Sequence, residues 1–405
     1  MRIITGTKTW ESAHIEWMDW ILIIGLSLAP MTGLRVWKVG PGEILCLLWG
    51  IRFLFRAKSL RSSLSIFFTL FILAMLIGSV IGYVVAPNEL RAVDLLTWIY
   101  LGIIAISLYE GLKSKSPSYV EMLFFTFAEV ATLWNLFLYG YSRIVSNTLL
   151  GAPLWYHGVR YSGGGTNPHQ VAVLLCGLTF IFLRSLLKRE KIVRSIALMS
   201  IAIYLMMETA SSTGILSIAG GFAIAAYFFV GDLFPKRKFG VLLVLTGIIL
   251  LTILIFARFF YRQFMNWVAE DKNGLGRISI FSSFGSSFIR SPLFGLGPGV
   301  HGIGGTIEFH NTYLEVLAAT GVVGGIVLIV YSVSLFKSVL TTDWKIFPIL
   351  TSMYAYGLAG FAMRRIVFWG LVVFVAVIAE QKNTAVRSET NMQPSNIVSK
   401  MLMPG

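Results

Sequence analysis

Long apolar runs recur along the chain and are separated by short polar segments. About twelve windows, each of roughly 17 to 25 residues with few charges, are long enough to cross a bilayer as helices. Their approximate bounds are 17–34, 41–55, 64–86, 95–112, 118–139, 171–187, 195–210, 214–231, 240–258, 311–336, 346–363 and 366–381. The pattern therefore predicts an all-α, polytopic membrane protein with about twelve transmembrane helices.

Composition supports this class. Of the 405 residues, 56% are hydrophobic and only 13% are charged, too few polar side chains to cover a soluble globule of this length. The formal net charge is +14, but the lysines and arginines are scattered through short loops instead of forming one basic face. They are better explained by membrane orientation than by nucleic acid, and no nucleic-acid partner is expected.

Basic residues also indicate the orientation. Placing both termini in the cytoplasm puts 20 of the 33 lysines and arginines on the inner side, many of them in short loops such as KREKIVR at 188–194. Two long connections, at about 140–170 and about 259–310, then lie outside, where loops of such length commonly carry function. We expect one transmembrane domain over residues 1–381, followed by a disordered cytoplasmic tail over residues 382–405.

The two outer loops hold most of the candidate chemistry, including His157, His169, His301 and His310. The second loop contains the glycine-rich stretch 295–305 and ends in FHNTYLEVLAATGVVGG at 309–325. From His310 to Gly321 is a rise of about 16 Å, so a continuous helix places both on nearly the same face. Gly321 and Gly325 have the G-x-x-x-G spacing that lets another helix approach closely.

Three motifs in this order resemble those of the O-antigen ligase and O-antigen polymerase superfamily. They are RYSGGGTNPHQVA at 160–172, then GRISIF at 276–281 with PLFGLGPG at 292–299, then HNTYLE at 310–315, eleven residues before Gly321. The resemblance covers about residues 155–330. It implies a GT-C-like membrane glycosyltransferase that uses a glycan linked to undecaprenyl diphosphate, in the bacterial inner membrane, with its active site facing the periplasm.

The resemblance also assigns roles to residues. Arg277 matches a family position and is expected to act on the donor diphosphate, since a guanidinium binds phosphate oxygens bidentately. His310 is expected to be the general base that accepts the proton of the acceptor hydroxyl. The residues assigned to substrate binding are Arg160, Asn167, Arg290, Asn311, Tyr313, Arg364 and Arg365. For the Arg364–Arg365 pair, snorkelling at the membrane interface is a competing interpretation.

One position departs from the family pattern. Ser212, three residues after Thr209, stands where the family has an arginine. Arg160, Arg290 and Arg364 are the candidates to supply the missing guanidinium. Together with the short interval from Arg277 to His310, this favours a polymerase that joins lipid-linked repeats. The histidine spacing favours a ligase that transfers the finished glycan to a lipid A core. A lipid-linked-glycan flippase or transporter is the alternative from another functional class.

No cofactor is expected. The sequence has no paired-carboxylate or H-E-x-x-H pattern, so we predict a metal-independent reaction. The expected partners are the lipid-linked donor, an acceptor glycan, the bilayer and a chain-length regulator. Acidic residues within the predicted spans are costly in hydrocarbon and are expected to face the interior or the interface. They are Glu43, Glu121, Glu129, Glu208 and Glu315.

Overall fold

The computed structural model describes residues 14–36, 39–54, 62–85, 92–248, 251, 284–299, 309, 311–358, 360 and 362–401, with side chains described as far as Ala385. The longer helices are α1 (Trp17–Leu28), α2 (Pro41–Leu54), α3 (Ser63–Val85), α4 (Ala92–Lys113), α5 (Pro117–Ile144), α6 (His169–Leu187), α7 (Ile192–Glu208), α8 (Ser212–Leu233), α11 (Thr312–Thr342), α12 (Phe347–Tyr356) and α13 (Ile366–Met401). Residues 238–248 and 284–290 are also helical. Short 3₁₀ turns are η1 (Thr32–Leu34), η2 (Pro235–Arg237) and η3 (Trp344–Ile346).

Each predicted apolar window overlaps a helix of the described chain, and the all-α membrane class is confirmed. Within the described residues, seven helices are long and apolar enough to cross a membrane: α3, α4, α5, α6, α8, α11 and the first part of α13. The helix α12 has only 10 residues, about 15 Å of rise, which is half of a hydrocarbon core of roughly 30 Å. The predicted number of twelve spans stays a prediction.

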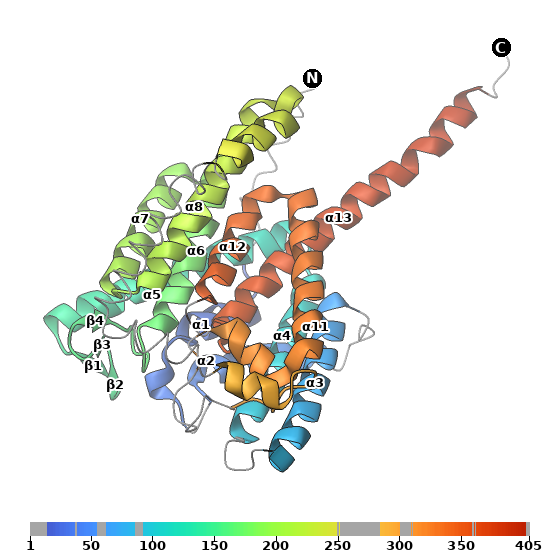
Figure 1. The fold of residues 1–405 in the computed structure, drawn as a ribbon. Coiled ribbons are helices and arrows are strands. Elements are labelled where there is room, and N and C mark those ends of the chain that lie inside the picture. The colour runs from blue at the N-terminus through green and yellow to red at the C-terminus, as the bar shows by residue number, and fades with distance from the viewer. Residues whose placement is uncertain are drawn as a thin grey trace.

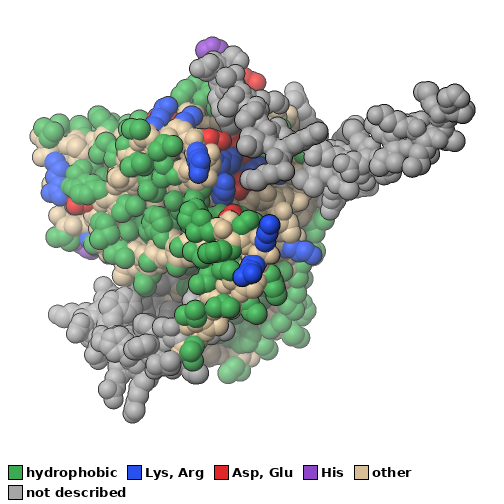
Figure 2. Space-filling view, turned by 90° about the horizontal axis from the view of Figure 1, so that it is seen from above, with side chains coloured by type: hydrophobic (Ala, Val, Ile, Leu, Met, Phe, Trp, Pro, Cys, Tyr) green, Lys and Arg blue, Asp and Glu red, His purple; other side chains and the backbone are tan. Residues whose placement is uncertain are grey.

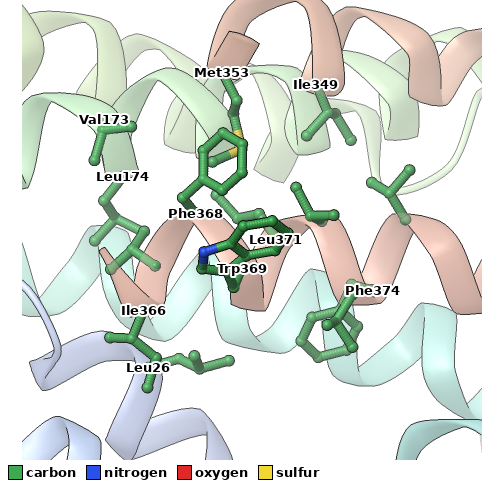
Figure 3. Close-up of a cluster of buried hydrophobic side chains, with 14 of the residues drawn as sticks. Leu26, Val173, Leu174, Ile349, Met353, Ile366, Phe368, Trp369, Leu371 and Phe374 are labelled. Carbon is green, nitrogen blue, oxygen red and sulfur yellow. The ribbon is translucent and has the colours of Figure 1, made fainter. Parts of the chain in front are cut away.

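The centre of the bundle is built around α6 and α13, the two most buried of the seven candidate spans. Trp369 of α13 is fully buried against Phe67 and Phe68 of α3. On its other sides α13 packs against α6, α12 and α1, as Figure 3 shows with Leu174 and Met353. These helices are apolar on most faces because their neighbours, and not water, surround them.

The bundle has two polar ends, which lie at opposite sides of Figure 1. The hairpin end carries two small β-hairpins after α5 and the starts of α6, α8 and α11. The first hairpin pairs β1 (Thr148–Leu149) with β2 (Ala152–Pro153), and the second pairs β3 (Trp155–Tyr156) with β4 (Arg160–Tyr161). The lysine-rich end holds the connections from α4 to α5, from α6 to α7 and from α11 to α12. The sequence predicts the hairpin end to be the outer one.

The structure corrects the prediction of a continuous helix from His310 to Gly321. Helix α11 is broken at Gly321, whose φ of 60° and ψ of −161° are not helical. At the break, the backbone of the segment 292–297 lies against α11: Val322 N donates to Pro292 O at 2.9 Å, and Leu296 N donates to Ala318 O at 2.9 Å. A Cβ at Gly321 would lie 2.3 Å from the carbonyl carbon of Leu293. The absence of a side chain at Gly321 therefore allows the helix to break and the loop backbone to pack against it.

Helix α13 continues beyond residue 381, where the last predicted span ends. Lys382 Nζ donates to Asp343 Oδ2 at 2.7 Å, and Asn383 Nδ2 donates to Ser338 Oγ at 2.9 Å. The first residues of the predicted tail are thus helical and in contact with the end of α11. The disordered cytoplasmic tail expected over residues 382–405 stays a prediction.

Candidate functional site at the hairpin end

The segment that resembles the family motif connects β4 to α6. Tyr161 is buried, and its hydroxyl donates to the carbonyl of Asn135 on α5 at 2.8 Å. Gly163 and Gly164 both have positive φ, 55° and 83°, which allows the tight turn that follows. The carbonyl of Gly164 accepts from Gly33 N at 2.9 Å. These contacts fix the segment against α5 and η1.

Asn167, predicted to bind substrate, forms a hydrogen bond to the backbone at the start of α6. Its Oδ1 accepts a hydrogen bond from His169 N at 2.9 Å. An asparagine oxygen at this point satisfies one of the backbone N–H groups that a helix start leaves without an intrahelical partner. The structure thus shows an anchoring role for Asn167, and substrate binding by it stays a prediction.

Arg160 reaches the junction between α7 and α8. Its side chain is half-buried, and Nε donates to the carbonyl of Thr209 at 3.0 Å. The junction is tight: Ala210 has a φ of 46°, and Ser211 caps α8 by accepting from Gly214 N at 3.2 Å. Ser212, where the family pattern has an arginine, begins α8 at this junction. Arg160 therefore places a guanidinium at the α7–α8 junction, where Ser212 replaces the arginine of the family pattern.

Next to Arg160, three side chains from separate elements form a hydrogen-bonded cluster. His169 Nδ1 at the start of α6 lies 2.7 Å from the hydroxyl oxygen of Tyr356 at the end of α12. Ser211 Oγ lies 3.2 Å from the same nitrogen and 3.3 Å from the same hydroxyl. Ser211 and Tyr356 are fully buried, whereas His169 is half-buried. We call this the His169 cluster.

Arg365 approaches the same region from the segment that precedes α13. With the Gln170 amide oxygen turned toward it, Arg365 Nη1 donates to that oxygen at 3.0 Å, and the amide nitrogen donates to Pro30 O at 3.0 Å. Thr32 of η1 also hydrogen-bonds to the Gln170 amide. Arg160 contacts Thr209, two residues before Ser211. Two guanidinium groups therefore contact residues close in sequence to members of the His169 cluster.

Arg364 has a different environment from Arg365. Its Nη2 lies 2.6 Å from Asp94 Oδ1 at the start of α4, and its Nη1 lies 2.9 Å from Glu315 Oε1 on α11. Its side chain is only 14% exposed, so interfacial snorkelling is wrong for this residue. Two carboxylates neutralise its charge inside the protein. Binding of substrate by Arg364 stays a prediction, but the structure gives it first a structural role.

The acidic residues in the predicted spans face the interior or the interface, as expected. Each of the five is paired with a cation. The pairs are Glu43–Arg35, Glu121–Arg184, Glu129–Arg194, Glu208–Arg143 and Glu315–Arg364. Pairing of this kind offsets part of the cost of removing a carboxylate from water.

Asn311 and Tyr313 hold the start of α11 in place. Asn311 is its N-cap: Oδ1 accepts from the backbone N–H groups of Tyr313 and Leu314, each at 3.0 Å. Its Nδ2 donates to Leu358 O at 2.7 Å, and the Tyr313 hydroxyl donates to Tyr354 O at 2.7 Å. Both side chains thus join α11 to the end of α12. Their predicted contacts with substrate are not tested by these bonds.

The two predicted catalytic residues, His310 and Arg277, lie outside the described residues, as does His301. Arg290 is described at the end of the helix 284–290, where Nη2 donates to the carbonyl of Val85 on α3 at 3.0 Å. The hairpin end therefore brings together Arg160 and Arg365 of the predicted set, and it places Arg290 at the end of α3.

Sequence reasoning missed the His169 cluster as a unit. His169 had a signal, because it follows Asn167 and Pro168 in the segment that resembles the family motif. Ser211 also had one, as part of the polar break between two apolar windows. Tyr356 had none, since it lies inside an apolar window and only the fold brings it to His169.

Comparison with known families tests the resemblance. Residues 195–329 match the model of a family described as O-antigen ligase. The match supports the resemblance to the O-antigen ligase and polymerase superfamily. No curated protein matches the chain.

The O-antigen ligase match covers about one third of the chain, from α7 to the middle of α11. It therefore includes the α7–α8 junction, the segment 291–299 and the break at Gly321. It ends before α12 and begins after α6, so the resemblance of residues 160–172 to a family motif rests on their sequence alone. The candidate site combines elements inside the match with α6 and α12, which the match does not cover.

Within the described residues, no three His, Cys, Asp or Glu side chains lie together as ligands for a metal ion. The predicted metal independence of the reaction remains a prediction. What the described site offers is two guanidinium groups, an imidazole and several hydroxyl groups, a set suited to binding and orienting an anionic group.

Proposed function

We propose that this protein is a membrane glycosyltransferase that transfers a glycan from an undecaprenyl-diphosphate-linked donor to an acceptor sugar hydroxyl. The reaction takes place at the hairpin end, on the periplasmic side of the bacterial inner membrane. Both termini then lie in the cytoplasm. The match of residues 195–329 to a family described as O-antigen ligase supports the enzyme class.

The observation that carries this proposal is the contact between Arg160 and Thr209. It brings the guanidinium that precedes α6 to the α7–α8 junction, inside the region that matches the family. Arg365 contacts Gln170, which follows His169 of the same cluster. Two guanidinium groups near one polar region suit a diphosphate, because a guanidinium binds phosphate oxygens bidentately. Arg277 is the third guanidinium that the sequence predicts.

The proposed chemistry needs a base and a bound leaving group. The acceptor hydroxyl oxygen forms a bond to the anomeric carbon of the donor sugar, and its proton passes to the imidazole of His310. The bond from that carbon to the phosphate oxygen breaks, and the leaving diphosphate keeps the electron pair. Arginine side chains stabilise the negative charge that develops on the diphosphate.

Between the two enzyme types, we favour a polymerase of lipid-linked repeats over a ligase that acts on a lipid A core. The short interval between Arg277 and His310 supports this choice. Ser212, in place of the family arginine, is a weaker argument for a polymerase, because Arg160 supplies a guanidinium at the same junction.

The test uses the purified full-length protein in detergent, with a lipid-linked repeat as the only sugar substrate. A ladder of products identifies a polymerase. A single transfer that occurs only after a lipid A core is added identifies a ligase. Movement of the lipid-linked glycan across reconstituted vesicles, without a new glycosidic bond, would instead establish a flippase and refute the enzyme proposal.

Arg160→Met tests the residue that carries the proposal. Loss of one charge-assisted contact to phosphate is expected to lower kcat/KM by about 10- to 100-fold. The matched control is Arg143→Met, since Arg143 also lies at the hairpin end, where its guanidinium stacks on Trp155 and pairs with Glu208. Arg143→Met is expected to retain activity. Equal activity of the two variants would show that Arg160 does not bind the donor.

A further inference from the structure

A cavity of about 180 Å³ lies at the lysine-rich end, between α5, α6 and the turn that joins α6 to α7. Since roughly 10–15 Å³ of such space is enough for one water molecule, the cavity accommodates a much larger group. Its lining has two characters. Met122, Phe125 and Ile181 form an apolar side, and Arg184, Lys188 and Lys191 supply positive charge.

Positive charge exceeds negative charge in the ion-pair network beside the cavity. Glu121 accepts from Arg184 Nη2 at 2.6 Å and from Lys188 Nζ at 2.7 Å. Asp343 accepts from the same arginine at 3.0 Å and from Lys382 at 2.7 Å. Three cations thus share two carboxylates. Figure 2 looks onto this end and shows the lysine and arginine side chains gathered around acidic ones.

Lys191 adds a further cation at the cavity. Its ammonium nitrogen lies 4.2 Å from the centre of the Phe125 ring. Among the described residues it makes no ion pair and no side-chain hydrogen bond, and Glu190 beside it is the one further carboxylate of the lining. Lys191 is exposed, so a ligand can reach it from outside the bundle.

The backbone of the turn holds these lysines in place. Arg189 and Lys191 have φ values of 61° and 45°, in the left-handed region that residues with a side chain rarely adopt. Such conformations persist only where the surrounding structure imposes them, and they cluster at ligand sites. Burial and the neighbouring charge of Arg184 lower the pKa of Lys188. A bound anion would favour the charged form of this lysine.

We propose that the cavity binds the phosphate group of an acidic phospholipid, with the phosphate at Lys188 and Lys191 and the adjoining glycerol and first methylenes against Phe125. The apolar side favours an amphiphile over a free phosphate ion. Basic pockets between helices at the cytoplasmic side of membrane proteins bind lipid headgroups in this way. The site lies at the opposite end of the bundle from the His169 cluster, and it does not depend on the proposed glycosyl transfer.

Native mass spectrometry of the detergent-purified full-length protein tests the proposal. The wild-type protein is titrated with phosphatidylglycerol, with zwitterionic phosphatidylcholine and with inorganic phosphate. We expect retention of phosphatidylglycerol in preference to the other two. The variant Lys191→Gln is expected to bind it about fivefold more weakly, the contribution of one lysine close to an acidic headgroup. Because Lys191 has no ion pair to lose, this variant is expected to fold.

The matched control is Lys236→Gln, which removes an exposed lysine of η2 at the same end of the bundle. Equal weakening by both variants would show that binding follows the overall charge of this end, and would refute a specific phospholipid site in the cavity. Unchanged binding in Lys191→Gln would do the same. Binding of inorganic phosphate that displaces the lipid would overturn the assignment to a phospholipid. No glycosyl transfer is measured, so failure here leaves the proposed function untouched.

Discussion

The imidazole Nδ1 of His169 lies 2.7 Å from the hydroxyl oxygen of Tyr356, although the two residues are 187 positions apart. The contact joins the start of α6 to the end of the short helix α12. Ser211, at the start of α8, completes the cluster. A hydroxyl both donates and accepts, so two hydroxyl groups can satisfy the ring nitrogen and each other in the buried interior. The cluster thereby fixes three elements of the hairpin end relative to one another.

A double-mutant cycle tests whether this cluster acts as a unit. Tyr356→Phe and Ser211→Ala are each expected to lower the free energy of unfolding by about 1 kcal/mol, the net value of a typical buried hydrogen bond. Because the two hydroxyl groups share a partner, the double variant is expected to lose less than the sum. Denaturant unfolding in detergent measures the three values.

The control for this cycle is Ser217→Ala. Ser217 is also buried on α8, but its hydroxyl donates to the backbone of Thr213 and not to the cluster. Its effect is expected to add to that of Tyr356→Phe. Strict additivity for Ser211 as well would show that the cluster is three independent contacts.

Arg364 is expected to be more important for stability than for binding. Arg364→Met leaves Asp94 and Glu315 buried without their cation, which is expected to cost about 3–5 kcal/mol of unfolding free energy. The exposed pair of Lys113 and Glu380, each 40% exposed, gives the comparison. Lys113→Met is expected to cost less than about 1 kcal/mol. A small effect of Arg364→Met on thermal unfolding in detergent would mean that water replaces the cation.

Gly321 is expected to tolerate no side chain. The left-handed backbone alone costs alanine roughly 1–2 kcal/mol, and its Cβ would also meet the backbone of Leu293. Gly321→Ala is therefore expected to destabilise the protein by more than about 2 kcal/mol. Gly220 on α8 has nothing within 4 Å of an added Cβ, so Gly220→Ala is expected to raise stability by about 0.5–1 kcal/mol. Similar thermal unfolding of both variants would contradict the break in α11.

The ion pairs at the lysine-rich end predict a dependence of stability on pH. Burial acts to raise the pKa of Asp343, but the charges of Arg184 and Lys382 outweigh it and lower the pKa to about 2. An aspartate with a depressed pKa in the folded state stabilises the protein above its unfolded pKa of about 3.9. That contribution, about 2 kcal/mol, is lost as the pH falls from about 4 to 2.

Unfolding of the detergent-solubilised protein at pH 5 and at pH 3 measures this dependence. Asp343→Asn removes the titrating group, and it is expected to be less stable at pH 5 and to depend less on pH in this range. An equal change with pH in both proteins would assign the effect to other carboxylates.

The sequence alone predicted the helices and the class of protein. Each helix follows from its own run of apolar residues, because a backbone in hydrocarbon must satisfy its hydrogen bonds within the segment. The resemblance to the superfamily was also predicted from the sequence, because the motifs that carry it lie in short local stretches. The sequence also predicted that the acidic residues of the spans face the interior or the interface, because charge within a membrane span is costly.

The identity of the partners of these acidic residues came only from the tertiary structure. Arg364 pairs with Asp94, which is 270 positions away, and with Glu315, which is 49 positions away. No local pattern relates residues so distant in sequence. The same holds for Arg160, whose contact with Thr209 places it at the junction where the family pattern has an arginine.

The break at Gly321 separates what local sequence predicts from what tertiary contacts decide. The apolar residues around Gly321 predict one uninterrupted helix, and the spacing of Gly321 and Gly325 predicts a helix-packing motif. Whether a glycine packs against a helix or lets a loop replace part of the hydrogen-bond ladder depends on the segment that reaches it from elsewhere, here residues 292–297. Local periodicity determined which segments are helical. Contacts between distant segments decided where a helix breaks, which charges are neutralised and which polar groups meet at the site.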